Sequence, residues 1–277
     1  MTDFPVARVT RLSAIVVVTH DAQQLARFYE DLLGFSRTEE TRLSGLGFEA
    51  RMGLPGSAQA IHLRLGEERI ELVQCDRPGA TYPDGVAGDD PRFQHFAVVV
   101  SDMAAAWALL KDAPGWTPIS QDGPVRLPPR SGAVEAMKFR DPEGHPLELL
   151  AFPAAATPQS WRGQRGLFLG IDHSAITVAD PRRSIEFYKG LGMSITAQTH
   201  NVGIEQSRLD GVAGADVAVA ALSPSEPDPH VELLGYASVR PPTPVGPTDV
   251  AATRMIFAGS TSATLADPDG HRLAVLS

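Results

Sequence analysis

The chain has 277 residues, of which 43% are hydrophobic, and its formal net charge is −9 at pH 7. A chain of this size can bury a sizeable core and is long enough for two ordinary domains. Acidic and basic residues are mixed along it, so no basic stripe could neutralise a phosphate backbone, and nucleic acid is not expected as a partner. The opening MTDFPVARVTRL has no charged region followed by an apolar one, and the early apolar run, Ile15 to Val18, is too short to span a bilayer. Neither export nor a membrane is expected.

The sequence contains one cysteine, Cys75. A single cysteine excludes an internal disulfide and fits a reducing compartment, so we expect the protein in the cytoplasm. Cys75 lies in the apolar stretch IELVQC, which favours a packing role over a nucleophile.

A strand, an aspartate and a helix with Phe-Tyr and Leu-Gly at fixed offsets occur twice. The first copy, LSAIVVVTHDAQQLARFYEDLLGF, contains Asp21, and the second, IDHSAITVADPRRSIEFYKGLGM, contains Asp180. A looser copy, FQHFAVVVSDMAAAWALLKDAPGW, has Asp102 at the same place but no Phe-Tyr pair. The β-branched runs predict strands, and each aspartate can cap the helix that follows it.

Each copy continues with short strands separated by Gly and Pro turns and ends on an apolar strand. These endings read GEERIELVQC, DPEGHPLELLAF, DPHVELLGY and DPDGHRLAVLS. The Asp-Pro-x-Gly-His turn in two of them, at 141–145 and 267–271, predicts a hairpin turn into the last strand.

These pieces define four modules, named modules one to four in chain order, at 11–76, 93–152, 170–235 and 250–277. We expect an N-terminal domain at 1–153 containing the first pair, a linker at 154–169, and a C-terminal domain at 170–277 containing the second pair. Module four is short. We expect no helix between Arg254 and Asp267, and the loss of one strand.

The recurring strand-Asp, Phe-Tyr, Leu-Gly and DPxGH features resemble the vicinal oxygen chelate superfamily of glyoxalases, bleomycin resistance proteins and extradiol dioxygenases. The resemblance covers nearly the whole chain. It implies an α+β fold in which tandem βαβββ modules form two curved, mainly antiparallel sheets around cups, with helices outside. It also implies up to four metal ligands per cup, from the first strand of a module, seven residues before the capping aspartate, and from a Glu in its closing strand.

When these ligand positions are mapped onto the sequence, the two halves of the chain carry different residue types at them. In the first half the four positions hold Ala14, His95, Glu71 and Glu148; in the second half they hold His173, Arg254, Glu232 and Ala274. The resemblance therefore implies that Glu71, His95 and Glu148 converge in the first cup. A set of one imidazole and two carboxylates suits a divalent Fe, Mn, Ni, Co or Zn ion.

The candidate catalytic residues are Glu71 and Glu148, either of which could serve as proton shuttle. The second cup is expected to lack metal. There His173 and Glu232 are ligands or structural residues, and Arg254 pairs with Glu232 or clamps an anionic group.

Two functions remain open. The first is a metal-dependent enzyme of lyase, isomerase or dioxygenase type that acts on a small oxygenated substrate. The second is a metal-free small-molecule binding or resistance protein of the bleomycin-resistance type, which the incomplete ligand sets in both halves favour. The sequence also leaves open a homodimer and a lid role for the proline-rich tracts at 224–229 and 240–247. His20 and His62 are expected to be surface or core residues.

Overall fold

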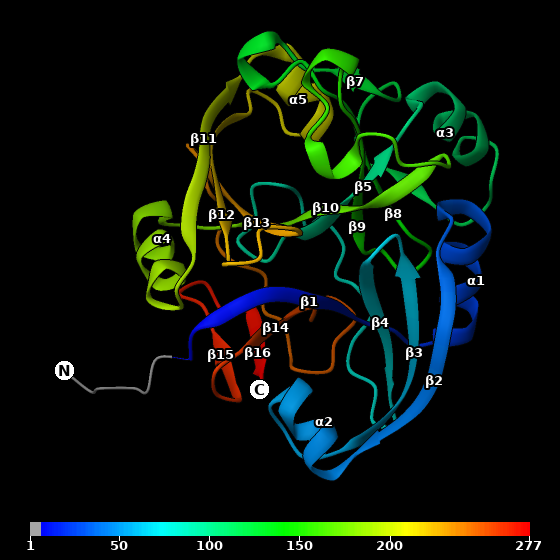
Figure 1. Cartoon of the computed structure of the whole chain (residues 1–277), viewed down its shortest axis with the longest axis vertical. Coiled ribbons are helices and arrows are strands. Elements are labelled where there is room, and N and C mark those ends of the chain that lie inside the picture. The colour runs from blue at the N-terminus through cyan, green and yellow to red at the C-terminus, as the bar shows by residue number, and fades with distance from the viewer. Residues whose placement is uncertain (1–6) are drawn as a thin grey trace.

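The structure is a computed structural model that describes residues 7–277 (Figure 1). Module one comprises β1 (Val9–Val18), α1 (Ala22–Leu33), β2 (Ser36–Ser44), α2 (Gly45–Met52), β3 (Ser57–Leu65) and β4 (Glu68–Cys75). Module two comprises β5 (Gln94–Val100), α3 (Met103–Leu110), β6 (Thr117–Pro118), β7 (Val125–Arg126), β8 (Glu135–Arg140) and β9 (Pro146–Ala151). Module three comprises β10 (Phe168–Thr177), α4 (Pro181–Gly190), β11 (Ser194–Val202), α5 (Ile204–Asp210), β12 (Asp216–Ser223) and β13 (His230–Tyr236).

Module four has only the strands β14 (Arg254–Gly259), β15 (Ala263–Ala266) and β16 (Arg272–Leu276). The predicted loss of its helix and one strand is confirmed. Among the described residues, no helix is long and apolar enough to cross a membrane.

The three predicted helices begin directly after their capping aspartates. The Asp21 carboxylate accepts a hydrogen bond from the backbone N–H of Gln24 at 2.9 Å, and Asp102 accepts one from Ala105 at 3.0 Å. Asp180 caps α4 in the same way. These bonds satisfy backbone donors that have no partner within the helix, and they fix where each helix starts.

The strands form two mainly antiparallel sheets. One has seven strands in the order β15-β16-β14-β1-β4-β3-β2, and the other has nine, in the order β11-β12-β13-β10-β5-β9-β8-β6 with β7 beside β8. Within each module the first strand pairs in parallel with the last. The halves meet within each sheet, where β1 pairs antiparallel with β14 and β5 pairs antiparallel with β10.

The expected partnership of modules around each cup is therefore wrong. Module one shares the seven-stranded sheet with module four, and module two shares the nine-stranded sheet with module three. The hydrogen bonds of β1 and β5 explain this arrangement, because each of these opening strands has one edge paired within its own module and the other edge paired across the halves.

Consecutive modules nevertheless share a hydrophobic core on the helix-bearing faces of the sheets. One core joins modules one and two around α1 and α3, and another joins modules three and four around α4 and includes Ala7, Val9 and Leu12 from the start of the chain. Two buried tyrosines cross these cores: the Tyr29 hydroxyl donates to Asp141 at 3.0 Å, and the Tyr188 hydroxyl donates to Asp267 at 3.3 Å. The Phe-Tyr pair of one module thus contacts the DPxGH turn of the next.

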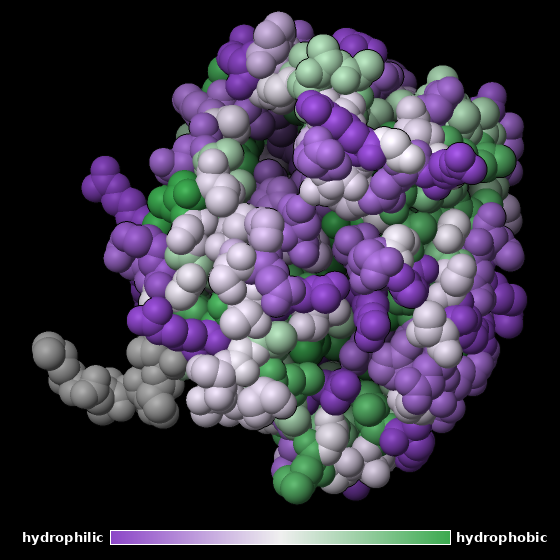
Figure 2. Space-filling view, in the orientation of Figure 1, coloured by the Kyte–Doolittle hydropathy of each residue, from purple (hydrophilic) through white to green (hydrophobic). Residues whose placement is uncertain are grey.

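Two short helices that the sequence patterns did not predict, α2 and α5, lie over the cups at opposite ends of the molecule (Figure 1). In the seven-stranded sheet, Phe48 and Met52 of α2 pack with Ala14, Val16 and other small apolar side chains of the cup. Apolar groups therefore fill much of that cup. The nine-stranded cup keeps an open cavity, and Figure 2 shows this face hollowed near β11 and α5.

Candidate functional site

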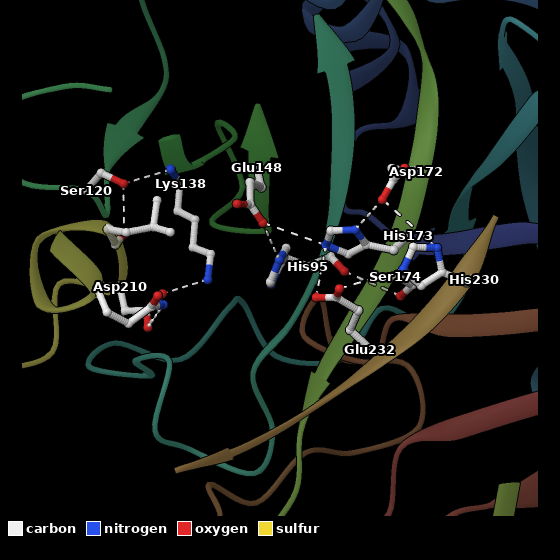
Figure 3. Close-up of polar contacts among 12 residues, drawn as sticks. His95, Ser120, Lys138, Glu148, Asp172, His173, Ser174, Asp210, His230 and Glu232 are labelled. Atoms are coloured by element: carbon white, nitrogen blue, oxygen red, sulfur yellow. Dashed lines mark hydrogen bonds and ion pairs between the residues drawn. The ribbon is translucent and has the colours of Figure 1, made fainter. Parts of the chain in front are cut away.

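Among the titratable side chains that line the cavity of the nine-stranded cup, four form a cluster with one member from each of four neighbouring strands (Figure 3). They are Glu232 on β13, His173 on β10, His95 on β5 and Glu148 on β9. The register is symmetric about the seam, because His95 lies opposite Ala175 and His173 lies opposite Ala97. Each half of the chain thus supplies one imidazole and one carboxylate.

Three of the four side chains, those of His95, Glu148 and His173, place ligand atoms within 4.8 Å of one another, and Glu232 adjoins them through His173. His95 Nε2 lies 2.9 Å from Glu148 Oε2. His173 Nε2 lies 3.7 Å from Glu148 Oε2 and 3.6 Å from Glu232 Oε2. These last two distances exceed hydrogen-bond range, and His173 Nε2 is a buried nitrogen without any hydrogen-bond partner. If this buried nitrogen is protonated, it is a hydrogen-bond donor without an acceptor. If it is unprotonated, its lone pair is available to bind a metal ion.

Asp172 and His230 also line the cavity and contact members of this cluster. The His173 ring places Nδ1 2.9 Å from an Asp172 carboxylate oxygen. If Nδ1 carries the proton, Nε2 presents its lone pair to the cavity, which is the arrangement of metal-ligating histidines whose second nitrogen donates to a carboxylate. His230 Nε2 lies 3.6 Å from Glu232, the most exposed member of the cluster with a side chain 25% exposed.

The local charges shift the ionisation of these groups. Burial raises the pKa of Glu148, but Lys138 and the imidazoles of His173 and His95 outweigh it, so this pKa lies well below its usual value. Burial likewise opposes ionisation of Glu232, yet His173 and His230 lower its pKa to about 2. Both carboxylates are therefore anionic at neutral pH.

The two histidines shift in opposite directions. Burial, together with the charge of Lys138, lowers the pKa of His95. Burial acts in the same direction on His173, but Glu232, Asp172 and Glu148 outweigh it and raise its pKa well above 6.5. Without an ion in the cup, His173 is the member of the cluster that holds a positive charge.

The cavity in front of this cluster has a volume of about 420 Å³ and combines the polar group with apolar walls from strands and α5. At its side, Lys138 Nζ donates to Asp210 at 2.7 Å. Asp210 also accepts hydrogen bonds from Gln206 at 2.7 Å and from the Tyr236 hydroxyl at 2.8 Å. This volume and lining suit a small molecule with a few polar groups.

Glu71 lies in the other cup, so the expected convergence of Glu71 with His95 and Glu148 is wrong. Its carboxylate accepts a hydrogen bond from Arg51 Nε at 3.0 Å and lies 3.8 Å from a ring nitrogen of His62. Of the expected trio, the structure brings together His95 and Glu148, and it adds His173 and Glu232 to them.

Arg254 also lies in the seven-stranded cup, so it does not pair with Glu232 of the other sheet. It is 1% exposed and donates to the backbone carbonyl oxygens of Ala252 at 2.7 Å and of Pro247. Burial, and secondarily Arg272, lower its pKa to about 10. The four ligand positions of this cup are Ala14, Glu71, Arg254 and Ala274, which leaves a single metal-binding residue type there.

The offsets in the sequence identified all four members of the cluster but assigned them to two different cups. Asp172, Lys138 and His230 were missed. A local signal existed for Asp172, because an aspartate directly precedes the ligand-position histidine in IDHS. Lys138, on β8, carries no such signal.

His20, His62 and Cys75 have structural contacts. His20 Nε2 lies 3.0 Å from the carbonyl oxygen of Gly79, and His62 Nε2 lies 2.9 Å from the Thr41 hydroxyl. Cys75 is a buried free thiol whose pKa is raised by burial.

The paired curved sheets and the His/Glu cluster on opening and closing strands define the vicinal oxygen chelate class. A family model described as the Glyoxalase/Bleomycin resistance protein/Dioxygenase superfamily matches residues 11–149 and 170–246, and the chain belongs to this superfamily. No significant sequence match to a curated protein was found.

Solved structures show the same fold. Glyoxalase I from Zea mays superposes with a TM-score of 0.60 at 15% identity, covering 96% of this chain and 92% of the maize chain. The "putative dioxygenase" from Bacillus subtilis subsp. subtilis str. 168 superposes with a TM-score of 0.54 at 10% identity, covering 97% of this chain and 85% of the other. At these identities the likeness concerns the fold.

Proposed function

We propose that this protein is a metal-dependent enzyme whose nine-stranded cup holds one divalent ion through His95, Glu148, His173 and Glu232. The observation that carries the proposal is the buried Nε2 of His173, which has no hydrogen-bond partner and lies 3.6 and 3.7 Å from two carboxylates. Two imidazoles and two carboxylates form a mixed N/O set that suits Fe, Mn, Ni, Co or Zn. A divalent ion bound there would supply Lewis-acid stabilisation of negative charge on neighbouring substrate oxygens.

Residues of the protein would bind the substrate and transfer protons. The apolar parts of the cavity wall can hold the hydrocarbon part of a substrate, while Lys138 adds a positive charge beside the cluster. Glu148 is engaged with His95 at 2.9 Å, whereas Glu232 makes only longer contacts and is more exposed. Glu232 is therefore the carboxylate better placed to move a proton, in the role first expected of Glu71 or Glu148. Proton transfer at an oxygenated carbon favours isomerase or lyase chemistry over ring cleavage.

Metal analysis of protein purified without chelator tests the proposal. We expect about one divalent ion per chain, and loss of that ion in His173→Ala and Glu148→Ala. His200→Ala is the matched control, because His200 lies on β11 with a side chain 64% exposed and forms its ion pair with Asp216, away from the cluster. Metal retained in both cup variants, or no metal in the parent protein, contradicts the proposal.

Activity would then be sought on α-hydroxycarbonyl compounds and catechols, which carry adjacent oxygens.

The free cysteine fits a reducing compartment, and we propose the cytoplasm as the place of action. A homodimer stays a prediction that sedimentation analysis would test.

A metal-free binding protein is the second candidate. The contact between His95 and Glu148 favours it, because these two groups satisfy one another without an ion. Under this alternative, chelator treatment leaves both the thermal stability and the ligand affinity of the parent protein unchanged.

A further inference from the structure

A second cavity lies in the seven-stranded cup, away from the His/Glu cluster. It has a volume of about 380 Å³ and is bordered by the end of α2, the loop before β14, and β15 and β16. Three arginines line it, Arg51, Arg254 and Arg272, and none of its lining residues is acidic. In a chain with a net charge of −9, this is a local excess of positive charge.

Arg254 is the centre of this excess. Its side chain is almost fully buried, yet its hydrogen bonds go only to backbone carbonyl oxygens, and no carboxylate of the described residues lies within ion-pair distance. Carbonyl oxygens satisfy the N–H groups, but they leave the charge uncompensated. A buried guanidinium without a counter-charge is costly, and a bound anion would remove that cost.

Arg272 adds a second positive charge beside the first, and Asp249 offsets only part of it without forming an ion pair. The two arginines are register partners on the parallel strands β14 and β16. Arg51, by contrast, already forms an ion pair with Glu71 at 3.0 Å. Neighbouring like charges repel one another unless an anion lies between them, so the pair Arg254 and Arg272 defines where the ligand's charge belongs.

The rest of the cavity wall is apolar, with one hydroxyl. It consists mainly of Met52, Leu54, Pro247, Thr264, Leu265 and Leu273. Such a wall would hold the hydrocarbon part of a ligand, and the cavity is large enough for a small organic molecule. Planar guanidinium groups match both carboxylate and phosphate oxygens.

We propose that this cavity is a binding site for a small organic anion, a carboxylic acid or phosphate monoester, whose charged group is held by Arg254 and Arg272 and whose apolar part lies against Met52, Leu265 and Leu273. The site shares no residue with the proposed metal cluster, so this proposal is independent of the proposal that the protein is a metal-dependent enzyme.

Calorimetry and thermal unfolding of the full chain test this with four probes: benzoate, phenyl phosphate, inorganic phosphate and benzamide. Benzoate or phenyl phosphate should bind saturably and raise Tm, since a ligand that binds only the folded state stabilises it. Benzamide has the same ring without the charge and should have no effect. The response to benzoate and to phenyl phosphate shows which of the two acid groups the site prefers.

Arg272→Gln is the deciding variant, because Arg272 is only partly buried and its loss relieves repulsion, so the variant should fold. We expect it to weaken anion binding by at least about tenfold, as expected for the loss of a charge-assisted contact. Arg69→Gln is the matched control: Arg69 is an exposed arginine on β4 of the same sheet that does not line the cavity.

Three results would overturn the proposal. They are the absence of saturable anion binding, equal affinity in Arg272→Gln and the parent protein, and equal loss in Arg69→Gln. The second result would also place any observed binding elsewhere, for example in the nine-stranded cup. Equal affinities for inorganic phosphate and phenyl phosphate would remove the organic part of the proposed ligand.

Discussion

Replacing Lys138 with Met should destabilise the protein markedly, although Lys138 is not among the proposed ion ligands. Lys138 and Asp210 are 5% and 2% exposed and form a 2.7 Å ion pair beside the cavity. Removing one partner of such a buried pair costs about 3–5 kcal/mol. Asp210 keeps its hydrogen bonds from Gln206 and Tyr236, so we expect the lower end, about 3 kcal/mol. This corresponds to a fall in Tm of about 6–12 °C.

Urea and thermal unfolding of matched variants measure this loss. Lys111→Met removes an exposed lysine at the end of α3 and should change the free energy of unfolding by less than about 0.5 kcal/mol. The double variant Lys138→Met with Asp210→Asn should recover part of the loss, since it no longer buries an unpaired carboxylate. A loss below about 1 kcal/mol in Lys138→Met, or a double variant less stable than the single one, would refute the reasoning.

Three further predictions concern the cluster and the cores. Asp172→Asn should weaken metal binding by about 10- to 100-fold, measured by competition with a chelator, because the His173 ring loses its orienting carboxylate. The pKa of His173 is raised in the metal-free folded protein, so this residue contributes stability that is fully present below about pH 6.5 and is lost as the pH rises through the folded-state pKa. Because a metal displaces the proton from His173, metal binding should release a proton near neutral pH. Calorimetry in buffers of different ionisation enthalpy would detect this release. Ala14→His should leave the metal content unchanged and lower the free energy of unfolding by about 1–3 kcal/mol, because Ala14 is 6% exposed within the apolar filling of the seven-stranded cup; increased metal binding in this variant would show that the module partnership is misplaced.

The sequence was sufficient for the strands, for the helices that follow the capping aspartates and for the four residues of the His/Glu cluster. Strand patterns, capping aspartates and the DPxGH turns are local signals, and each follows from hydrogen bonds within a few residues. The offset from the capping aspartate placed His95 and His173 correctly on their opening strands.

The partnership of modules was not available from these local signals. It depends on which opening strand pairs with β5, and both β10 and β1 contain apolar runs that could do so. The two helices over the cups were missed for a related reason: α2 has a Gly-rich start and α5 is only seven residues long, so neither shows a clear helical period. Lys138 and Asp210 come together across 72 positions, a contact that only the folded sheet creates.

The separation of cores and sheets has a consequence for how the protein can be divided. The core around α1 and α3 lies mostly in the N-terminal half, whereas the core around α4 also includes Ala7, Val9 and Leu12 of that half, and each cup needs one opening strand from each half. A cut within 154–169 should therefore yield an N-terminal fragment that retains most of its core and a C-terminal fragment that loses part of its core, and both fragments should expose the free edges of their opening strands. Neither fragment alone could bind the ion, and mixing them should restore binding through fragment complementation.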